Sequence, residues 1–180
     1  MISPASLLVL LLTLLTHWPP QAQPTDTSDV SGMITQVCDH TLNGKLCRSV
    51  LESGGPASDY SELARIALRA AMANASAIFN HVDSLVRAGD PDPFVRQCLS
   101  DCSDDYQDAM DQIEDSLAAL ETRGYDDVSA WVGAAMNDAD SCEEGFKSKT
   151  GYRSPLTDMN EAFHDICTII IAISHLLIET

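Results

Sequence analysis

The chain has 180 residues, which is long enough for one domain with a buried core, and its 45% hydrophobic content is typical of a folded protein. It carries 10 Lys+Arg against 27 Asp+Glu, giving a formal net charge of −17. Nucleic acids and anionic membranes attract basic faces, so this charge argues against both as partners. It favours a basic protein partner, or simply a soluble surface.

The N-terminus has the features of a targeting segment. Residues 7–15 read LLVLLLTLL, an apolar run of the length found in secretory signals. Pro19 and Pro20 stop the run before it reaches the roughly 20 residues that a membrane span needs. We therefore predict a signal peptide over residues 1–23, a secreted mature chain, and a flexible polar segment over residues 24–31.

A short helical hairpin is predicted next, over residues 32–55. Cys38 and Cys47 enclose the turn dipeptide Asn43-Gly44. In the oxidising environment of a secreted protein, an even number of cysteines indicates disulfides, so we expect Cys38 and Cys47 to be linked. No cysteine spacing resembles a zinc site, and neither a metal nor another cofactor is expected.

A long, alanine-rich helix is predicted over about residues 59–87. Asp59 and Glu62 resemble a capping box at its start. Its expected inward positions are Leu63, Ile66, Ala67, Ala70, Ala73, Ala77, Ile78, His81 and Leu85. Asn74 begins the sequence Asn-Ala-Ser, an N-glycosylation signal in a secreted chain, and its use requires Asn74 to face solvent.

The helix predicted over about residues 93–122 has two parallel stripes. An apolar stripe with steps of three and four residues, typical of a packed helix, consists of Cys98, Cys102, Tyr106, Ala109, Ile113, Leu117 and Leu120. The adjoining acidic stripe consists of Asp101, Asp104, Asp108, Asp111 and Asp115. The acidic stripe is the candidate surface for a protein partner; the alternative is a solvated face without one.

Two more helices are predicted, over about residues 126–145 and 157–178. Their expected core positions include Trp131 in the first and Phe163, Ile170 and Ile173 in the second. The apolar run 166–178 is too short for a membrane span and continues a helical core pattern, so we expect a buried helix. Four long helices with short connections predict an all-α, up-down-up-down four-helix bundle preceded by the hairpin.

The remaining cysteines fit this topology. Cys102 lies 22 residues before Gly124 and Cys142 lies 18 residues after it. In an antiparallel helix pair that turns near Gly124, the two cysteines therefore have similar heights, and a disulfide between them is geometrically sensible. Cys98 and Cys167 are left either as a third pair or as free buried thiols.

The sequence contains none of the common catalytic motifs: no nucleophile elbow, zinc-protease helix, P-loop or dinucleotide fingerprint. Adjacent carboxylates such as Asp104-Asp105 and Glu143-Glu144 fall on polar faces, where the ionised form is favoured and acid catalysis is not. We therefore expect no catalytic residues and no enzymatic activity. A rigid, disulfide-linked bundle of this kind is more often a binding protein.

Four segments, in order, carry a family resemblance. They are Cys38-x-x-Thr41 with Cys47; Cys102-x-x-x-Tyr106 with Ala109; Tyr125-Asp-Asp-Val with Trp131 and Asp140-Ser-Cys142-Glu-Glu-Gly-Phe146; and Ser154-Pro-Leu-Thr157 with Asn160, Cys167 and Ile171-Ala-Ile173. Together they make residues 33–177 resemble the plant pectin methylesterase inhibitor and invertase inhibitor family. The resemblance implies the same bundle, with disulfides Cys38–Cys47 and Cys102–Cys142.

The resemblance also implies a function. Such a protein is a secreted inhibitor that caps the substrate cleft of a cell-wall enzyme in a 1:1 complex, using the bundle helices. The acidic stripe would then face a cleft shaped for anionic pectin, with binding sensitive to salt and pH. Its place would be the apoplast or cell wall, or the vacuole if the target is a vacuolar invertase.

Three functions stay open at this point. The Pro-Lys-Phe tripeptide of some invertase inhibitors is missing, and only Pro93-Phe94 echoes it, which favours pectin methylesterase as the target. The block Ser154-Pro-Leu-Thr157 instead looks like chains described as invertase inhibitors, so acid invertase is the alternative. The third is a non-inhibitory helical binding or structural protein.

Overall fold

The computed structural model describes residues 27–179, and the signal peptide predicted over residues 1–23 lies outside them. Within this range all of the regular secondary structure is helical. The helices are α2 (Thr27–Cys38), α3 (Gly44–Ser53), α4 (Tyr60–Ala88), α5 (Pro93–Glu121), α6 (Tyr125–Lys147) and α7 (Thr157–Ile178). Their limits lie within a few residues of the predicted ones, except at the start of α2.

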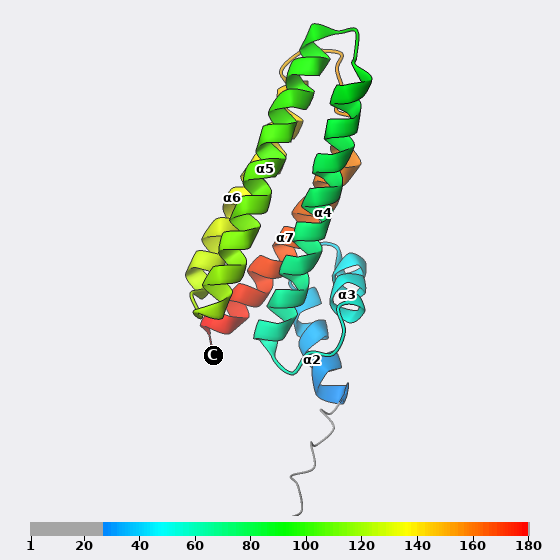
Figure 1. The fold of residues 1–180 in the computed structure, drawn as a ribbon. Helices are drawn as coiled ribbons and strands as arrows, with labels where there is room; N and C mark the ends of the chain where they lie inside the picture. The colour runs from blue at the N-terminus through cyan, green and yellow to red at the C-terminus, as the bar shows by residue number, and fades with distance from the viewer. Residues whose placement is uncertain (1–26, 180) are drawn as a thin grey trace, which may run out of the picture.

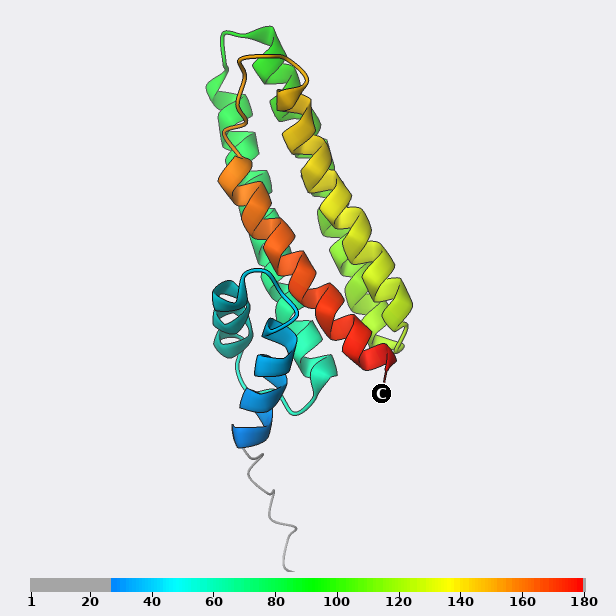
Figure 2. The same cartoon turned by 180° about the vertical axis from the view of Figure 1, so that it is seen from behind.

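The four long helices form an antiparallel bundle (Figures 1 and 2). Helix α5 packs between α4 and α6, and α7 closes the bundle by packing against both α6 and α4. The hairpin α2–α3 lies beside the lower half of the bundle, against α4 and α7 (Figure 2). The predicted up-down-up-down bundle with an N-terminal hairpin is thus confirmed.

Local side chains fix where the helices begin. The Asp59 carboxylate accepts a hydrogen bond from the backbone N–H of Glu62 at 2.9 Å, and the Glu62 side chain accepts from the backbone N–H of Ser58. This is the predicted capping box, except that the Glu62 side chain accepts from the residue before the N-cap and not from the N-cap itself. Helix α5 begins with Pro93 at its first position, capped by Asp92, which accepts from the Phe94 N–H at 2.8 Å.

The hairpin approaches α4 closely at Gly54, which packs against Ile66. A Cβ atom on Gly54, at the end of α3, would lie 2.1 Å from the Ile66 side chain of α4. Only glycine allows the two helices to meet this closely. The Gly54-Gly55-Pro56 break therefore does more than end α3, because it provides the surface on which Ile66 packs.

The prediction of a flexible segment over residues 24–31 was wrong for its described part. Helix α2 already begins at Thr27, so residues 27–31 are helical. Asp29 in the first turn suits a helix N-terminus, where negative charge is stabilised. Val30 and Ile34 continue the apolar face of Val37 and pack on the core, which stabilises a segment that its polar composition disguises.

The predicted inward face of α4 was rotated from the observed one. Ala73, Ala77 and His81 are exposed. The prediction was right for Leu63, Ala67 and Ile78, and the full set of buried positions is Leu63, Ala64, Ala67, Leu68, Ala71, Ala75, Ile78 and Val82. Alanine is the common residue on both sides of this helix, so hydrophobicity gives little contrast, and the bulky Leu68 and Val82 decide which side faces the core.

Helix α7 is long and apolar enough to cross a membrane by length and composition, with a mean hydropathy of 1.6 in its most apolar part. Its large apolar side chains Phe163, Ile166, Ile169, Ile170 and Ile173 are buried in the bundle core. The expectation of a buried core helix agrees with this packing.

Both expected disulfides are present. Cys38–Cys47 closes the hairpin, with Cα atoms 5.5 Å apart, and Cys102–Cys142 links α5 to α6, with Cα atoms 4.6 Å apart. Cys98 and Cys167 are free and buried, which decides between the two alternatives left by the sequence. Burial raises the pKa of both thiols, so they stay protonated and unreactive.

The two disulfides should contribute unequally to stability. Replacing Cys102 and Cys142 by Ala should lower the free energy of unfolding by about 4 kcal/mol, because the link closes the longer loop. Replacing Cys38 and Cys47 by Ala should cost about 3 kcal/mol. Urea denaturation of both double variants measures the difference. A larger loss from the hairpin pair would contradict the chain-entropy account.

Candidate protein-contact face

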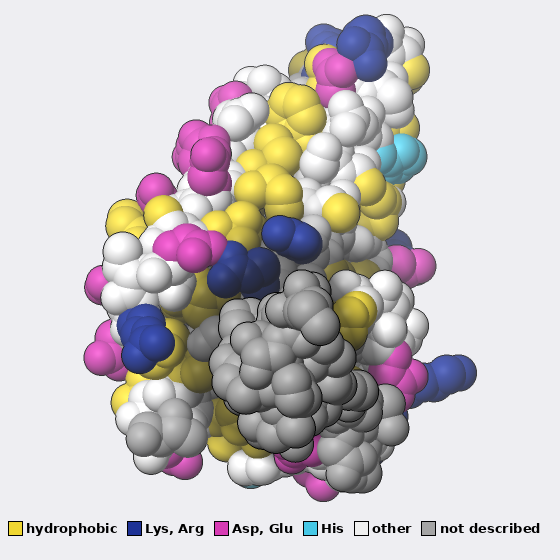
Figure 3. Space-filling view, turned by 60° about the horizontal axis from the view of Figure 1, so that its bottom comes forward, with side chains coloured by type: hydrophobic (Ala, Val, Ile, Leu, Met, Phe, Trp, Pro, Cys, Tyr) yellow, Lys and Arg dark blue, Asp and Glu magenta, His cyan; other side chains and the backbone are white. Residues whose placement is uncertain are grey.

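The acidic stripe lies on the outer surface of α5. All five of its residues, Asp101, Asp104, Asp108, Asp111 and Asp115, are exposed. Gln97 donates to the Asp101 carboxylate at 2.7 Å, and Gln107 donates to Asp111 at 3.3 Å. None of the five joins an ion pair within residues 27–179. Acidic side chains gather on the side of the molecule that α5 and α6 form (Figure 3).

This face rests on a rigid base. Cys102 follows Asp101 in α5 and is tied to Cys142 of α6 by the disulfide. Tyr106, one turn further along, is fully buried, and its ring lies 5.7 Å from that of Phe163 in an edge-on arrangement. The outer surface of α5 is therefore fixed in position relative to α6 before any partner arrives.

A buried hydrogen-bond network joins α5, α7 and α6. The Tyr106 hydroxyl donates to Asn160 Oδ1 at 2.8 Å, and Asn160 Nδ2 donates to Glu143 Oε2 at 3.0 Å. Thr157 donates to Glu143 Oε1 at 2.9 Å. Burial raises the pKa of Tyr106, so its phenol stays a hydrogen-bond donor. Tyr106, Thr157 and Asn160 belong to the segments that resemble the family, and they act here as structural residues.

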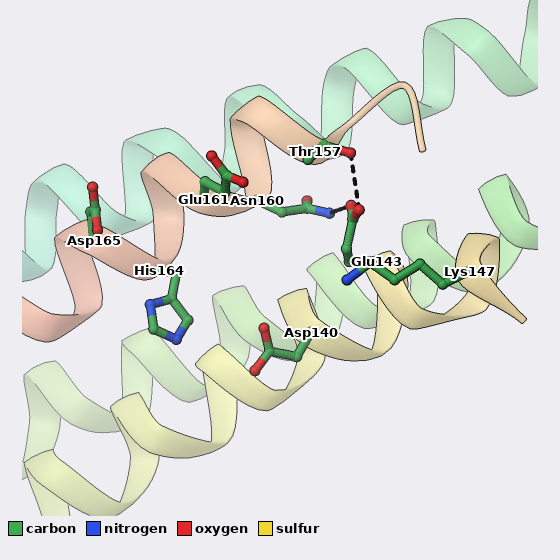
Figure 4. Close-up of a pocket in the computed structure, with 8 residues that line it drawn as sticks. All are labelled: Asp140, Glu143, Lys147, Thr157, Asn160, Glu161, His164 and Asp165. Carbon is green, nitrogen blue, oxygen red and sulfur yellow. Dashed lines mark hydrogen bonds between the residues drawn. The ribbon is translucent and has the colours of Figure 1, made fainter. Parts of the chain in front are cut away.

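The Glu143 end of this network opens into a polar groove between α6 and α7 (Figure 4), which sequence reasoning missed. The groove has a volume of about 450 Å³ and is lined by Asp140, Glu143, Lys147, Thr157, Asn160, Glu161, His164 and Asp165. No group of His, Cys, Asp or Glu in the described residues is arranged to hold a metal ion. The groove suits hydroxyl or basic groups of a partner.

Trp131 was predicted to be in the core, but 42% of it is exposed. It lies seven residues before Asp138, so the two share one side of α6. That side faces α5, because Asp138 interacts electrostatically with Asp105 and Asp108 of α5. Trp131 therefore belongs to the same face as the acidic stripe. Its steps to Val128 and Ala135 fit a core stripe, which is why periodicity alone misplaced it.

A cluster of two aromatic rings and a lysine lies at the end of the bundle opposite the hairpin, where the loop before α5 meets the loop after α6 (Figure 1). The Phe94 and Tyr152 rings lie 4.7 Å apart, and the Lys149 ammonium lies 4.9 Å and 4.6 Å from their centroids. The Tyr152 hydroxyl donates to Asp92. That hydrogen bond, followed by the Phe94 N–H, lowers the pKa of Asp92. The structure thus places a cation beside Pro93-Phe94.

N-glycosylation would require Asn74 to face solvent, and the structure does not place it that way. Its side chain is only partly exposed, and its Oδ1 atom is buried without a hydrogen-bond partner in the described part of the chain. An Asn side chain turned toward the bundle is less accessible than a sequon on a loop. Glycosylation of Asn74 stays a prediction.

Known proteins are similar to this chain in sequence. The chain is 27% identical over 175 residues to "Pectinesterase inhibitor" of Actinidia deliciosa, an alignment that covers 96% of this chain and 94% of that protein. It is 28% identical over 179 residues to "Cell wall / vacuolar inhibitor of fructosidase 2" of Arabidopsis thaliana, covering 97% and 99%. Relatives with both kinds of target are therefore about equally similar.

The fold has a solved counterpart. A mutant form of a pectin methylesterase inhibitor from Arabidopsis superposes with a TM-score of 0.71 at 24% identity, covering 79% of this chain and 95% of that one. A sequence model described as "Plant invertase/pectin methylesterase inhibitor" matches residues 32–173. The chain therefore belongs to the plant invertase/pectin methylesterase inhibitor family, a family of protein inhibitors rather than of enzymes.

Proposed function

We propose that this protein is a secreted inhibitor of plant pectin methylesterase that covers the substrate cleft of the enzyme in a 1:1 complex. One observation carries the proposal: five exposed carboxylates, which have no ion-pair partner among residues 27–179, lie on a face fixed by a disulfide. A cleft that accepts anionic pectin favours negative charge, so the stripe complements it electrostatically.

The α5–α6 face has the other properties of a protein interface. Its base is rigid, so little conformational freedom is lost on binding. Trp131 supplies a large, partly exposed aromatic side chain, the residue type most enriched among those that dominate binding energy. The surrounding carboxylates accelerate association with a basic surface and make it depend on salt.

The site of action that fits these features is the plant cell wall or apoplast. The predicted signal peptide over residues 1–23 supports export, and the name of one relative places that protein in the cell wall or vacuole. A vacuolar location would apply if the target were a vacuolar invertase.

A parallel titration decides between the targets. The purified, oxidised mature chain is added to a plant pectin methylesterase acting on pectin and to plant acid invertases acting on sucrose. Inhibition of the pectin methylesterase alone supports the proposal. Inhibition of neither enzyme, by a chain shown to be folded, would favour a non-inhibitory helical binding protein.

Acid invertase is the second candidate target, and one observation favours it. The missing lysine of the Pro-Lys-Phe tripeptide has a spatial substitute, because Lys149 places its ammonium over the Phe94 ring. A cation on an aromatic platform at the tip of the bundle could enter a glycosidase cleft, whose catalytic groups are carboxylates.

The acidic stripe can be tested by charge reversal. Changing Asp104, Asp108 and Asp111 together to Lys should weaken inhibition of pectin methylesterase at least about tenfold, because like charges would then face each other. Inhibition constants at low and high salt measure this. The control reverses Asp39, Glu52 and Glu179, which are exposed on the hairpin and at the end of the chain. Equal losses in both variants would exclude the stripe as the contact.

Trp131 should be a main anchor of the same complex. Trp131→Ala should weaken binding about thirtyfold, or about 2 kcal/mol, while the melting temperature changes little because the side chain is partly exposed. Calorimetry of binding and thermal unfolding give the two numbers. Val86→Ala, at an equally exposed position at the end of α4, is the control. Unchanged affinity of the Trp131 variant would remove it from the interface.

The invertase alternative depends on Lys149. If invertase is the target, Lys149→Gln should weaken inhibition about tenfold, because the loss of one charge at a close contact is of that order. Lys147→Gln, which removes an exposed lysine paired with Glu144 on α6, should have little effect. If both variants inhibit invertase as well as the parent, the aromatic tip is not the inhibitory element.

A further inference from the structure

Positive charge is concentrated in one short segment of this acidic chain. Residues 147–153, which run from the end of α6 into the loop before α7, read KSKTGYR and hold three of the ten Lys and Arg residues and no Asp or Glu. The rest of the chain holds the other seven basic residues and all 27 acidic ones. The segment lies at the end of the bundle opposite the hairpin (Figure 1), and Lys and Arg side chains gather at the upper end of the view in Figure 3.

The Lys149 ammonium in this segment is held by aromatic rings and not by a carboxylate. It lies 4.9 Å from the centroid of the Phe94 ring and 4.6 Å from that of Tyr152, and it donates to the Tyr152 hydroxyl at 3.3 Å. Among residues 27–179, Lys149 forms no ion pair. A cation–π contact positions an ammonium but leaves it N–H donors for an anion. Lys149 is therefore a positioned cation that can still bind a carboxylate.

The acidic residues at this end of the bundle have other partners or bind weakly. Asp92 caps α5 by accepting from the Phe94 N–H at 2.8 Å, and Asp90 accepts from the Asp92 N–H at 2.8 Å. Arg153 lies 3.8 Å from Asp158, but their side chains are 82% and 93% exposed. Ion pairs this exposed contribute little. The Arg153 guanidinium is thus available to another carboxylate.

The acidic stripe of α5 is too far away to repel an anion from this end. Asp101, the first residue of the stripe, lies eight residues after Pro93, or about 12 Å along the helix. The Debye length at physiological ionic strength is about 8 Å, so the charge of Asp101 is largely screened here, and the charges further along α5 are screened more. An anion can approach this end although the chain carries a net charge of −17.

We propose that Phe94, Lys149, Tyr152 and Arg153, which together form the aromatic tip, bind an acidic polysaccharide, a chain of uronate sugars with free carboxylates. Lys149 and Arg153 bind the carboxylates, and the planar guanidinium can take one through two parallel hydrogen bonds. The rings of Phe94 and Tyr152 are partly exposed. Their negative faces attract the C–H groups on the flat side of a sugar ring.

Other polyanions fit the aromatic tip less well. A nucleic acid duplex or an anionic membrane is broad, so it would also meet the acidic sides of the bundle, where it is repelled. A single polysaccharide strand can touch the tip alone. An acidic peptide could use the two cations but has no sugar ring for the corner that Phe94 and Tyr152 form, with ring centroids 4.7 Å apart and planes at 66°.

The choice of uronates among acidic sugars rests on the proposed function. Pectin methylesterase hydrolyses methyl esters, and each ester that it cleaves leaves one carboxylate on the polymer. An inhibitor whose tip binds this product is retained where the enzyme has acted. The α5–α6 face, which begins about 12 Å further along the bundle, stays free to meet the enzyme itself.

The test measures binding without any enzyme. The oxidised mature chain is titrated by calorimetry with polygalacturonate, with the same polymer fully methyl-esterified, and with polyglutamate. Polygalacturonate should bind at least about tenfold more tightly than the esterified polymer, because esterification removes the charges that Lys149 and Arg153 bind. It should also bind at least about tenfold more tightly than polyglutamate, which has carboxylates but no sugar rings.

Variants locate the site. Lys149→Gln combined with Arg153→Gln should weaken the binding of polygalacturonate at least about tenfold. Phe94→Leu, which removes the ring but keeps an apolar side chain, should weaken it about fivefold. The matched control is Lys45→Gln combined with Arg69→Gln, which removes two exposed cations from α3 and from α4 near the hairpin and should leave binding unchanged.

Three results would overturn the proposal: equal affinity for the esterified polymer, equal affinity for polyglutamate, or equal affinities of the tip variant and the control variant. NMR of the parent with a short uronate oligomer needs no variant. The amide signals of Phe94 and of residues 147–153 should shift, and shifts found only elsewhere would also contradict the proposal. Because no enzyme is present, a failure here leaves the inhibition of pectin methylesterase standing, and a failure of inhibition leaves polymer binding standing.

Discussion

The packing of α5 against α6 is the constraint on which the other features depend. The Cys102–Cys142 disulfide fixes the distance between the two helices, and Tyr106 connects them to α7 through Asn160 and Glu143. The exposed stripe and Trp131 are both located by this one contact. A partner meets a surface whose shape is set inside the bundle, so binding requires little rearrangement of the helices.

The architecture was predictable because its signals repeat over long helices. Steps of three and four residues in α5, α6 and α7, and the heights of Cys102 and Cys142 around Gly124, are sufficient to give the bundle and its link. The orientation of α4 was not predictable, because alanines such as Ala71 and Ala73 look alike in sequence although only Ala71 is buried. The start of α2 was missed because Thr27, Ser28 and Asp29 look like a loop until Val30 is seen to pack.

The candidate site, too, was predictable only in part. The five aspartates of the stripe could be placed from one helix alone, since periodicity within a helix fixes their common side. Apart from the Cys102–Cys142 link, contacts between helices were not accessible in this way. Trp131 follows the core period but lies at the edge of the buried arc, and Lys149 meets Phe94 only because two loops come together at the tip. The α6–α7 groove was also missed, because side chains from both helices form it.

The separation of the two stripes on α5 has a consequence for how such a chain can change over time. The residues that make the helix fold are Cys102, Tyr106, Ala109 and Ile113, and none of them is a residue that the stripe presents to a partner. Mutations can therefore accumulate at the five aspartate positions without a loss of folding, and selection can act on target choice and on the stability of the bundle separately. A duplicated gene could in this way acquire a new target through surface substitutions alone.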